Sequence, residues 1–522
     1  MRSTKKTAQK FTPKNNHLSR RDFLRILTIG STALVGNQIL SACTTPAAIE
    51  NTAGTNIPPL PDVEISIKAI KDSVSILSGK PTSVLRYQGE VINGPGNALI
   101  LLPDSYLGPI FNLNTGQHVR VHFKNDLSEK SIIHWHGLHV PVEADGHPRL
   151  AIEPGETYIY DFTVADRAGT YWYHPHPHGR TGPQVYAGLA GLFIISDKEE
   201  SSLHLPSGEF DVPLVIQDRI FDDNNQLVYD KNDMMDKMMG FLGNRILVNG
   251  QAEYHLNAAT RPYRFRLLNG SNSRIYKLAW EDGTPLTVMA TDGGLLEKPI
   301  SKEYITLAPG QRIELWVDFS HRSVGSQLRL VNLPGATPGG NASFPILTAI
   351  IDRVTTDQSK LPDQLTKMNL HDRSKAVNTA DPREFRISMG HGMTWLINGK
   401  TFDMNDVSSD EIVRLGDVEL WEFSNQRSSG MGMGMQLPHP MHIHGLQFQI
   451  LERQVDSAAQ AAWSSVSGGY VDAGWHDTVL VMPGERVKIL LKFEDFVGIY
   501  LYHCHNLEHE DMGMMRNYRV DA

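Results

Sequence analysis

The sequence has few cysteines, no excess of positive charge and no long apolar run beyond its first 43 residues. Only Cys43 and Cys504 occur among 522 residues, so a disulfide framework cannot stabilise the fold. The net charge of -9 argues against nucleic-acid binding, which needs a basic face. No later apolar stretch approaches the roughly 20 residues of a membrane-spanning helix. What remains is a globular composition, with room for three domains of about 150 residues.

The first 43 residues predict an export signal. Several lysines precede Arg20-Arg21, and an apolar stretch then runs to Leu40. This order is typical of a secretory signal, and the arginine pair resembles a twin-arginine signal of bacteria. The segment that ends in Cys43 resembles a lipobox, in which Cys43 would be acylated; the alternative is a free cysteine beside an ordinary cleavage site. We expect a periplasmic protein, with residues 44–61 as a flexible tether to a lipid anchor if Cys43 is acylated.

The rest of the chain repeats three markers in a fixed order. Each unit has an Asn-Gly turn, an alternating strand that ends in Asn, and a Pro-Gly turn before another alternating strand. The Pro-Gly turns lie at residues 154–155, 309–310 and 483–484. Short alternating runs between Gly, Pro and Asn indicate antiparallel β-sandwiches. We therefore predict an all-β fold with domains at residues 62–197, 198–355 and 383–522 and a linker at 356–382.

Histidines gather in four short clusters, which occupy only the first and third repeats. Ten of the 22 histidines belong to them: His134, His136, His174, His176, His439, His442, His444, His503, His505 and His509. In a strand, a His-x-His motif presents two imidazoles on one face, and neutral imidazole is a ligand for copper and zinc. One such pair can be a coincidence, but four cannot. The arrangement indicates a metal cluster shared by the first and third domains.

Cys504 indicates that the metal is copper. Together with His439, His509 and Met514 it supplies the two imidazoles, the thiolate and the weak axial thioether of a blue-copper electron-transfer site. Cys504 also lies between two of the clustered histidines on one predicted strand. An electron that arrives at its sulfur can therefore pass through a few backbone bonds to both neighbours.

These motifs resemble those of the multicopper oxidase family over about residues 58–522, most closely its bacterial cuprous oxidase and laccase members. The resemblance implies three cupredoxin-like Greek-key domains and four copper ions. It implies a type 1 copper on His439, Cys504, His509 and Met514, a type 2 copper on His134 and His442, and a type 3 pair on His136, His174, His176, His444, His503 and His505. In that family the type 1 site takes electrons singly from a reductant, and the other three coppers use four of them to reduce O2 to water.

Two carboxylates follow the histidine clusters. Asp145 comes after the first cluster, and Glu510 directly follows His509. The resemblance implies that both act as general acids in oxygen reduction, which consumes protons. Taken alone, each residue would be interpreted as a solvated loop carboxylate, and only its matching position favours the catalytic role.

Methionines give the only hint about the reductant. Met431, Met433 and Met435 alternate with glycine just before His439, and soft thioethers suit Cu(I), so we expect a cuprous entry loop there. A second group, Met234, Met235, Met238 and Met239, has the spacing of one helix face, for which core packing is the ordinary explanation. The long Met- and His-rich insertion of the best-known cuprous oxidases is not visible.

Three hypotheses follow. The favoured one is an exported cuprous oxidase that couples oxidation of Cu(I) to reduction of O2. The second is a laccase that oxidises phenolic donors. The third is a non-enzymatic cupredoxin scaffold, against which the complete set of twelve ligands argues. The oligomeric state stays open.

Overall fold

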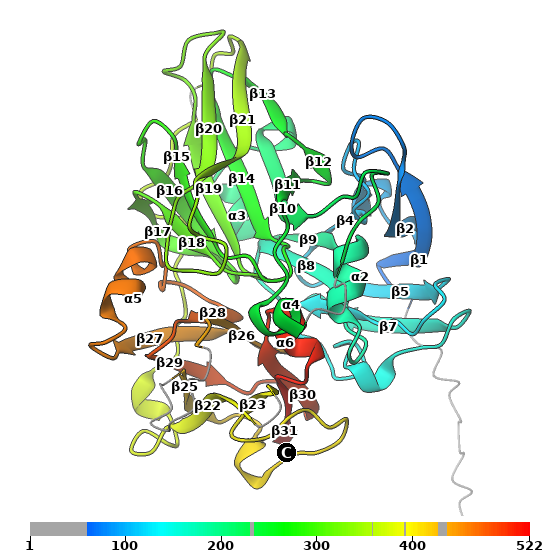
Figure 1. Ribbon diagram of the computed structural model, residues 1–522, viewed down its shortest axis with the longest axis vertical. Coiled ribbons are helices and arrows are strands. Elements are labelled where there is room, and N and C mark those ends of the chain that lie inside the picture. Colours follow the sequence, from blue (N-terminus) through cyan, green and yellow to red (C-terminus); the bar gives the residue numbers. More distant parts are fainter. Residues whose placement is uncertain (1–59, 230–233, 358, 391–392, 426–435) are drawn as a thin grey trace, which may run out of the picture. The chain divides into compact units, whose positions relative to one another are not determined.

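β-Strands dominate the secondary structure and fall into three consecutive groups, each of which forms two sheets (Figure 1). We name these groups domains 1, 2 and 3. The computed structural model describes residues 60–522 apart from 230–233, 358, 391–392 and 426–435. The predicted export signal with Cys43 and the methionine loop at residues 431–435 therefore lie outside the described residues.

Domain 1 contains β1 to β9. One sheet has the order β2-β1-β5-β7 and consists of β1 (Val63–Val74), β2 (Thr82–Asn93), β5 (His118–Asn125) and β7 (Thr157–Thr163). The other has the order β3-β4-β9-β8-β6 and consists of β3 (Leu99–Ile100), β4 (Ile110–Asn114), β6 (Ile133–His136), β8 (Gly169–Pro175) and β9 (Gly191–Ser196). Val63, Ile65 and Ile67 of β1 alternate with more exposed residues and bury one face. All four residues of β6 are buried, because both of its faces are covered.

Domain 2 contains β10 to β21. Its larger sheet has the order β12-β11-β10-β14-β19-β16-β17 and consists of β10 (Asp211–Arg219), β11 (Arg245–Val248), β12 (Gln251–Ala252), β14 (Pro262–Asn269), β16 (Leu286–Thr291), β17 (Gly294–Lys302) and β19 (Arg312–Asp318). The second has the order β13-β21-β20-β15-β18 and consists of β13 (His255–Ala259), β15 (Tyr276–Trp280), β18 (Ile305–Leu307), β20 (Gln327–Asn332) and β21 (Phe344–Arg353).

Domain 3 contains β22 to β31. One sheet has the order β23-β22-β25-β29-β27 and consists of β22 (Arg383–Met389), β23 (Trp395–Ile397), β25 (Val418–Ser424), β27 (Phe448–Val455) and β29 (Glu485–Lys492). The other has the order β24-β31-β30-β26-β28 and consists of β24 (Ile412–Arg414), β26 (His439–Ile443), β28 (Thr478–Val481), β30 (Gly498–Cys504) and β31 (Met515–Asp521). β26 and β30 are neighbours, and both carry clustered histidines.

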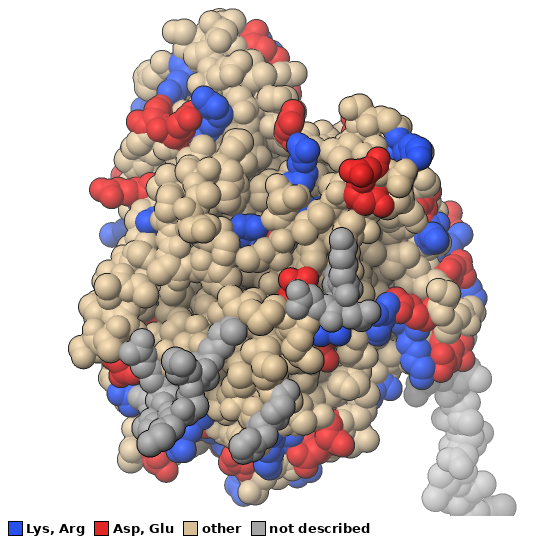
Figure 2. All heavy atoms as spheres, in the orientation of Figure 1, with Lys and Arg blue, Asp and Glu red and all other residues tan. Residues whose placement is uncertain are grey.

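The α-helices in the described part of the chain are short. They are α2 (Thr181–Ala187), α3 (Lys198–Ser202), α4 (Met234–Met239), α5 (Gln460–Ser467) and α6 (Leu507–Asp511). Among the described residues, no helix has the length and apolar character needed to cross a membrane. α6 of domain 3 contacts both α2 of domain 1 and α4 of domain 2, so the three domains meet at this helix (Figure 1). On the face drawn in Figure 2, acidic and basic side chains are interspersed.

The Pro-Gly markers are tight turns. Gly155, Gly310 and Gly484 have φ values of 87°, 84° and 77°, which favour glycine, and each lies one or two residues before the first residue of a strand. Pro followed by a residue with positive φ is the pattern of a type II turn. The repeated sequence signal therefore marks the starts of β7, β19 and β29.

Candidate metal centre

Three ligand atoms of domain 3 converge where β26, β30 and α6 meet. His439 Nδ1 lies 3.4 Å from Cys504 Sγ, His509 Nδ1 lies 3.7 Å from the same sulfur, and the two nitrogens are 3.2 Å apart. Met514 is fully buried, and its amide donates to the His509 carbonyl at 2.9 Å. We name these four residues the cysteine site. Its three converging atoms are close enough to hold one metal ion.

The other eight clustered histidines gather between domains 1 and 3 and form what we name the histidine cluster. β6 pairs with β8, which sets His134 opposite His174, and β26 pairs with β30, which sets His442 opposite His503. Rings from the two domains also stack on each other, with centroid distances of 3.7 Å for His134–His444 and for His136–His442. The cluster is fully buried.

Backbone carbonyls fix the orientation of two rings in the cluster. His134 Nδ1 lies 2.6 Å from the carbonyl oxygen of Asp145, and His442 Nδ1 lies 2.8 Å from that of Asp477. Each Nδ1 therefore carries the proton, and each Nε2 keeps its lone pair. These two Nε2 atoms face each other at 3.4 Å, as two ligands of one ion would.

Unsatisfied nitrogens show that the histidine cluster fits metal ions. Buried ring nitrogens without a hydrogen-bond partner include His136 Nδ1, His174 Nε2 and both nitrogens of His505. An unpaired buried polar atom costs about 1–3 kcal/mol, which a metal bond would offset. Burial also lowers the pKa of His174 to about 3 and that of His176 to about 4. Both rings are thus neutral, as ligands must be.

Burial has the opposite effect on Cys504. Its thiol is fully buried, and desolvation raises its pKa because the thiolate is disfavoured in apolar surroundings. A thiolate at this position needs a cation beside it. Two neutral imidazoles and a thiolate form a set of soft and borderline ligands that suits copper.

Comparisons with known proteins identify the family. Residues 86–200 and 369–522 match family models described as multicopper oxidase. The multicopper oxidase mco of Staphylococcus aureus is 32% identical over 455 residues, which cover 87% of this chain and 88% of that protein. This chain belongs to the multicopper oxidase family.

Solved multicopper oxidases share the fold. McoA of Aquifex aeolicus is 37% identical with a TM-score of 0.75, covering 89% of this chain and 97% of that one. A Campylobacter jejuni multicopper oxidase, described as a metallo-oxidase, is 29% identical with a TM-score of 0.71 and coverage of 88% and 91%. A Bacillus subtilis laccase is 31% identical over 74% of this chain and 79% of its own length. The predicted fold of cupredoxin-like sandwiches is confirmed, and the chain is a copper-dependent oxidoreductase that uses oxygen.

Both predicted acids of this multicopper oxidase lie beside the histidine cluster. Asp145 Oδ2 accepts from His444 Nδ1 at 2.9 Å, and Glu510 Oε2 lies 3.2 Å from His503 Nδ1. Asp145 is 1% exposed and Glu510 is 2% exposed, so neither is a solvated loop carboxylate. Burial raises the pKa of Asp145 to about 8, whereas for Glu510 burial would raise the pKa but His176 and His503 beside it lower it.

Sequence reasoning missed a third acid, Asp477. Its Oδ1 accepts from His136 Nε2 at 2.9 Å, which leaves His136 Nδ1 as the ligand atom. Arg312 of domain 2 holds this carboxylate with two hydrogen bonds of 2.8 and 2.5 Å and also donates to the Thr170 carbonyl of domain 1 at 2.9 Å. One arginine thus joins all three domains. In the sequence, Asp477 is marked only by the short apolar run that follows it. The structure shows that this run is β28, the neighbour of β26.

Helix α4, which contains the domain 2 methionines, contacts the cysteine site through Met238. The Met238 carbonyl in α4 accepts from His509 Nε2 at 2.8 Å, and Met238 is 2% exposed. Met234 and Met235 are half-exposed, so packing explains only part of this group. On β23, the Trp395 ring lies 4.7 Å from the His439 ring and 4.6 Å from the His509 ring. α4 and Trp395 together form what we name the cover of the cysteine site.

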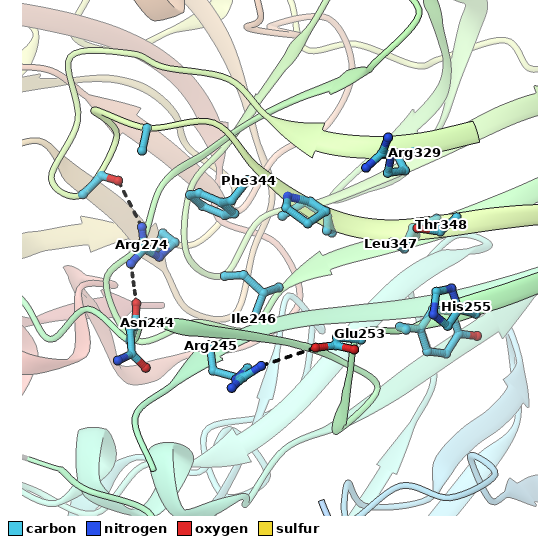
Figure 3. Close-up of a pocket in the computed structure, with 16 residues that line it drawn as sticks. Asn244, Arg245, Ile246, Glu253, His255, Arg274, Arg329, Phe344, Leu347 and Thr348 are labelled. Atoms are coloured by element: carbon cyan, nitrogen blue, oxygen red, sulfur yellow. Dashed lines mark hydrogen bonds and ion pairs between the residues drawn. The ribbon is translucent and has the colours of Figure 1, made fainter. Parts of the chain in front are cut away.

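A separate cavity of about 550 Å³ lies in domain 2 between β11 and β21 (Figure 3). At its rim Arg245 pairs with Glu253 at 3.5 Å. Deeper in, Arg274 donates to the carbonyls of Gly243 and Gly339 at 2.7 and 3.1 Å. None of the predicted copper ligands lines this cavity, and these arginines already have partners in the protein.

Proposed function

We propose that this multicopper oxidase is an exported cuprous oxidase, which converts four Cu(I) to four Cu(II) while one O2 and four protons become two waters. In this proposal the cysteine site holds the type 1 copper. His134 and His442 hold the type 2 copper, and the other six cluster histidines hold the type 3 pair. Bound copper would supply the electron transfer and the oxygen reduction; the chain supplies the ligands, the access route and the protons.

The cover of the cysteine site is the observation that favours Cu(I) as the reductant. His439 and His509 are both fully buried, so a large aromatic reductant has no exposed imidazole edge to contact. A metal ion needs only a small path lined with soft ligands. Met234 and Met235, 49% and 50% exposed, present thioethers on the outer side of α4, whose Met238 carbonyl bonds to His509. This arrangement supports a small, soft reductant over a phenol.

Methionine replacement tests the Cu(I) proposal. Leucine keeps the bulk of methionine and removes the sulfur, so Met234→Leu with Met235→Leu should raise the KM for Cu(I) several-fold at little cost in kcat. The predicted entry loop is tested in the same way with Met431→Leu, Met433→Leu and Met435→Leu. Steady-state rates with Cu(I) and with a phenol, on samples of equal copper content, give the comparison.

The two reductants separate the possible outcomes. Phenol oxidation should stay constant, because it needs no thioether, and Met368→Leu in the predicted linker is the matched control. Equal losses with both reductants would mean that the methionines are structural. Unchanged Cu(I) kinetics in both sets, with efficient phenol turnover, would favour the laccase hypothesis.

We also propose that the chain is exported through the twin-arginine route and anchored by Cys43. Arg20→Lys with Arg21→Lys should keep the precursor inside the cell. Cys43→Ala should give an exported protein without acylation. Palmitate labelling of the wild type that disappears in Cys43→Ala supports the anchor, whereas an unlabelled, released wild type would leave only ordinary cleavage.

A further inference from the structure

Helix α6 directs four consecutive residues to four different places. Glu508 contacts domain 2, His509 belongs to the cysteine site, Glu510 lies at the histidine cluster, and Asp511 binds the amides of Thr181 and Gly182 in domain 1. His509 is one of the predicted ligands, and Glu510 is one of the two predicted acids. Glu508 has neither role, yet it is only 4% exposed.

Among the described residues, the side chain of Glu508 accepts hydrogen bonds only from uncharged donors of domain 2. Its Oε1 accepts from the Tyr229 hydroxyl at 2.7 Å and from Asn272 Nδ2 at 2.8 Å. Its Oε2 accepts from the Phe241 amide at 3.0 Å and from the Ser273 hydroxyl. Burying a carboxylate is costly unless its oxygens are fully bonded. This carboxylate therefore binds three separate stretches of domain 2 to α6.

One of those stretches is the end of the cover. Phe241 follows α4 by two residues. Between them Gly240 has a φ of 86° and lies so close to Asn506 that a Cβ there would clash with the Asn506 side chain. Residues 238–241 are thus fixed at both ends. His509 Nε2 bonds to the Met238 carbonyl at one end, and Glu508 bonds to the Phe241 amide at the other.

We propose that Glu508 is a positioning residue of the cysteine site, which fixes residues 238–241 so that the Met238 carbonyl holds the His509 ring with Nδ1 directed at Cys504. A ligand histidine is oriented by the partner of its other nitrogen, and here that partner belongs to a different domain. The geometry of the copper site therefore depends on how domain 2 sits against α6. This holds whichever reductant the enzyme uses.

Glu508→Gln tests the proposal in the copper-loaded, full-length protein. The variant keeps the shape of the side chain. Its NH2 group, however, replaces an oxygen that had accepted hydrogen bonds, so it faces donors with which it cannot bond. The Phe241 amide should exchange its hydrogen about tenfold faster or more. The thiolate-to-copper absorption band and the type 1 electron paramagnetic resonance splitting should change, while the copper content stays constant.

Asp511→Asn is the matched control on the same helix. It should speed exchange at Thr181 and Gly182 and leave both the Phe241 amide and the type 1 spectrum as in the wild type. Should Glu508→Gln fail to fold, Tyr229→Phe removes one donor, keeps the ring, and should produce a smaller spectral change in the same direction. An unaltered type 1 spectrum in the folded Glu508 variant, or in Tyr229→Phe if that variant alone folds, would overturn the proposal.

Discussion

At the scale of single residues, the sequence is most informative where the side-chain type decides the chemistry. A thiolate, a thioether and paired imidazoles indicate copper without a structure. Ring orientation could not be predicted, because it depends on carbonyls and carboxylates that are close only in space. Asp477, the partner of His136, is 341 positions away from it in the chain.

Replacing the two predicted acids should slow only the oxygen half of the reaction. Asp145→Asn and Glu510→Gln keep the shape of each side chain and remove its capacity to accept and donate a proton, so O2 reduction should slow by about two orders of magnitude. Copper content and the blue colour should persist. Stopped-flow should show reduction of the type 1 copper at the normal rate and delayed reoxidation.

The control is Glu411→Gln, which replaces another buried carboxylate of domain 3 that bonds Arg516 and Tyr502. This variant should reoxidise at the wild-type rate. If Asp145→Asn and Glu510→Gln both turn over like the wild type, neither residue delivers protons.

At the scale of elements, local spacing predicted the helix α4 but not what it covers. Four methionines at helical spacing became α4, and the Pro-Gly turns became the starts of strands. The face that α4 buries depends on α6, since the hydrogen bond between them joins residues 271 positions apart. Core packing was therefore the reasonable interpretation of these methionines, and only the fold shows that α4 contacts the cysteine site through Met238.

Removing the indole from the cover should admit larger reductants. Trp395→Ala uncovers the edges of His439 and His509, so kcat/KM for a phenol should rise several-fold while that for Cu(I) changes little. The lost burial costs about 3–5 kcal/mol, so the unfolding temperature must be followed as well. Trp395→Phe keeps a ring and should behave like the wild type. If kcat/KM falls for both reductants in a folded variant, the indole supports the structure of the site rather than limiting access to it.

At the scale of the whole molecule, buried charged residues join the domains, and the alternation of side chains along a strand does not predict their burial. Arg264, Arg266 and Glu314 occupy β14 and β19, where alternation would direct charged side chains to solvent. They are instead 3%, 2% and 0% exposed, and Glu314 Oε1 accepts from the Thr170 hydroxyl of domain 1 at 2.7 Å. The outer face of this sheet is covered by another domain, which no local pattern reveals.

Removal of Glu314 should destabilise the fold in a pH-dependent way. Burial alone would raise the pKa of Glu314, but Arg264 and Arg266 lower it from 4.5 to about 2. Its stabilising contribution is therefore complete above 4.5 and is lost as the pH falls toward 2. Glu314→Gln should lower the free energy of unfolding by about 3–5 kcal/mol at neutral pH.

Urea unfolding of the copper-free chain at several pH values measures this effect. The difference between Glu314→Gln and the wild type should shrink as the pH falls below 4.5. Glu281→Gln breaks the exposed pair with Arg329 and should cost no more than about 1 kcal/mol. If the difference in free energy of unfolding between Glu314→Gln and the wild type stays constant down to strongly acidic pH, the ion pairs are not its cause.

Copper content and blue absorption of the loaded protein test the central claim most directly. The twelve ligands should hold about four copper ions per chain, one at the cysteine site and three at the histidine cluster, and the thiolate should make the protein blue. Cys504→Ser should lose the blue band and the oxidase activity while the fold survives. A colourless wild-type protein that contains zinc, or one that binds a single copper, would contradict the account.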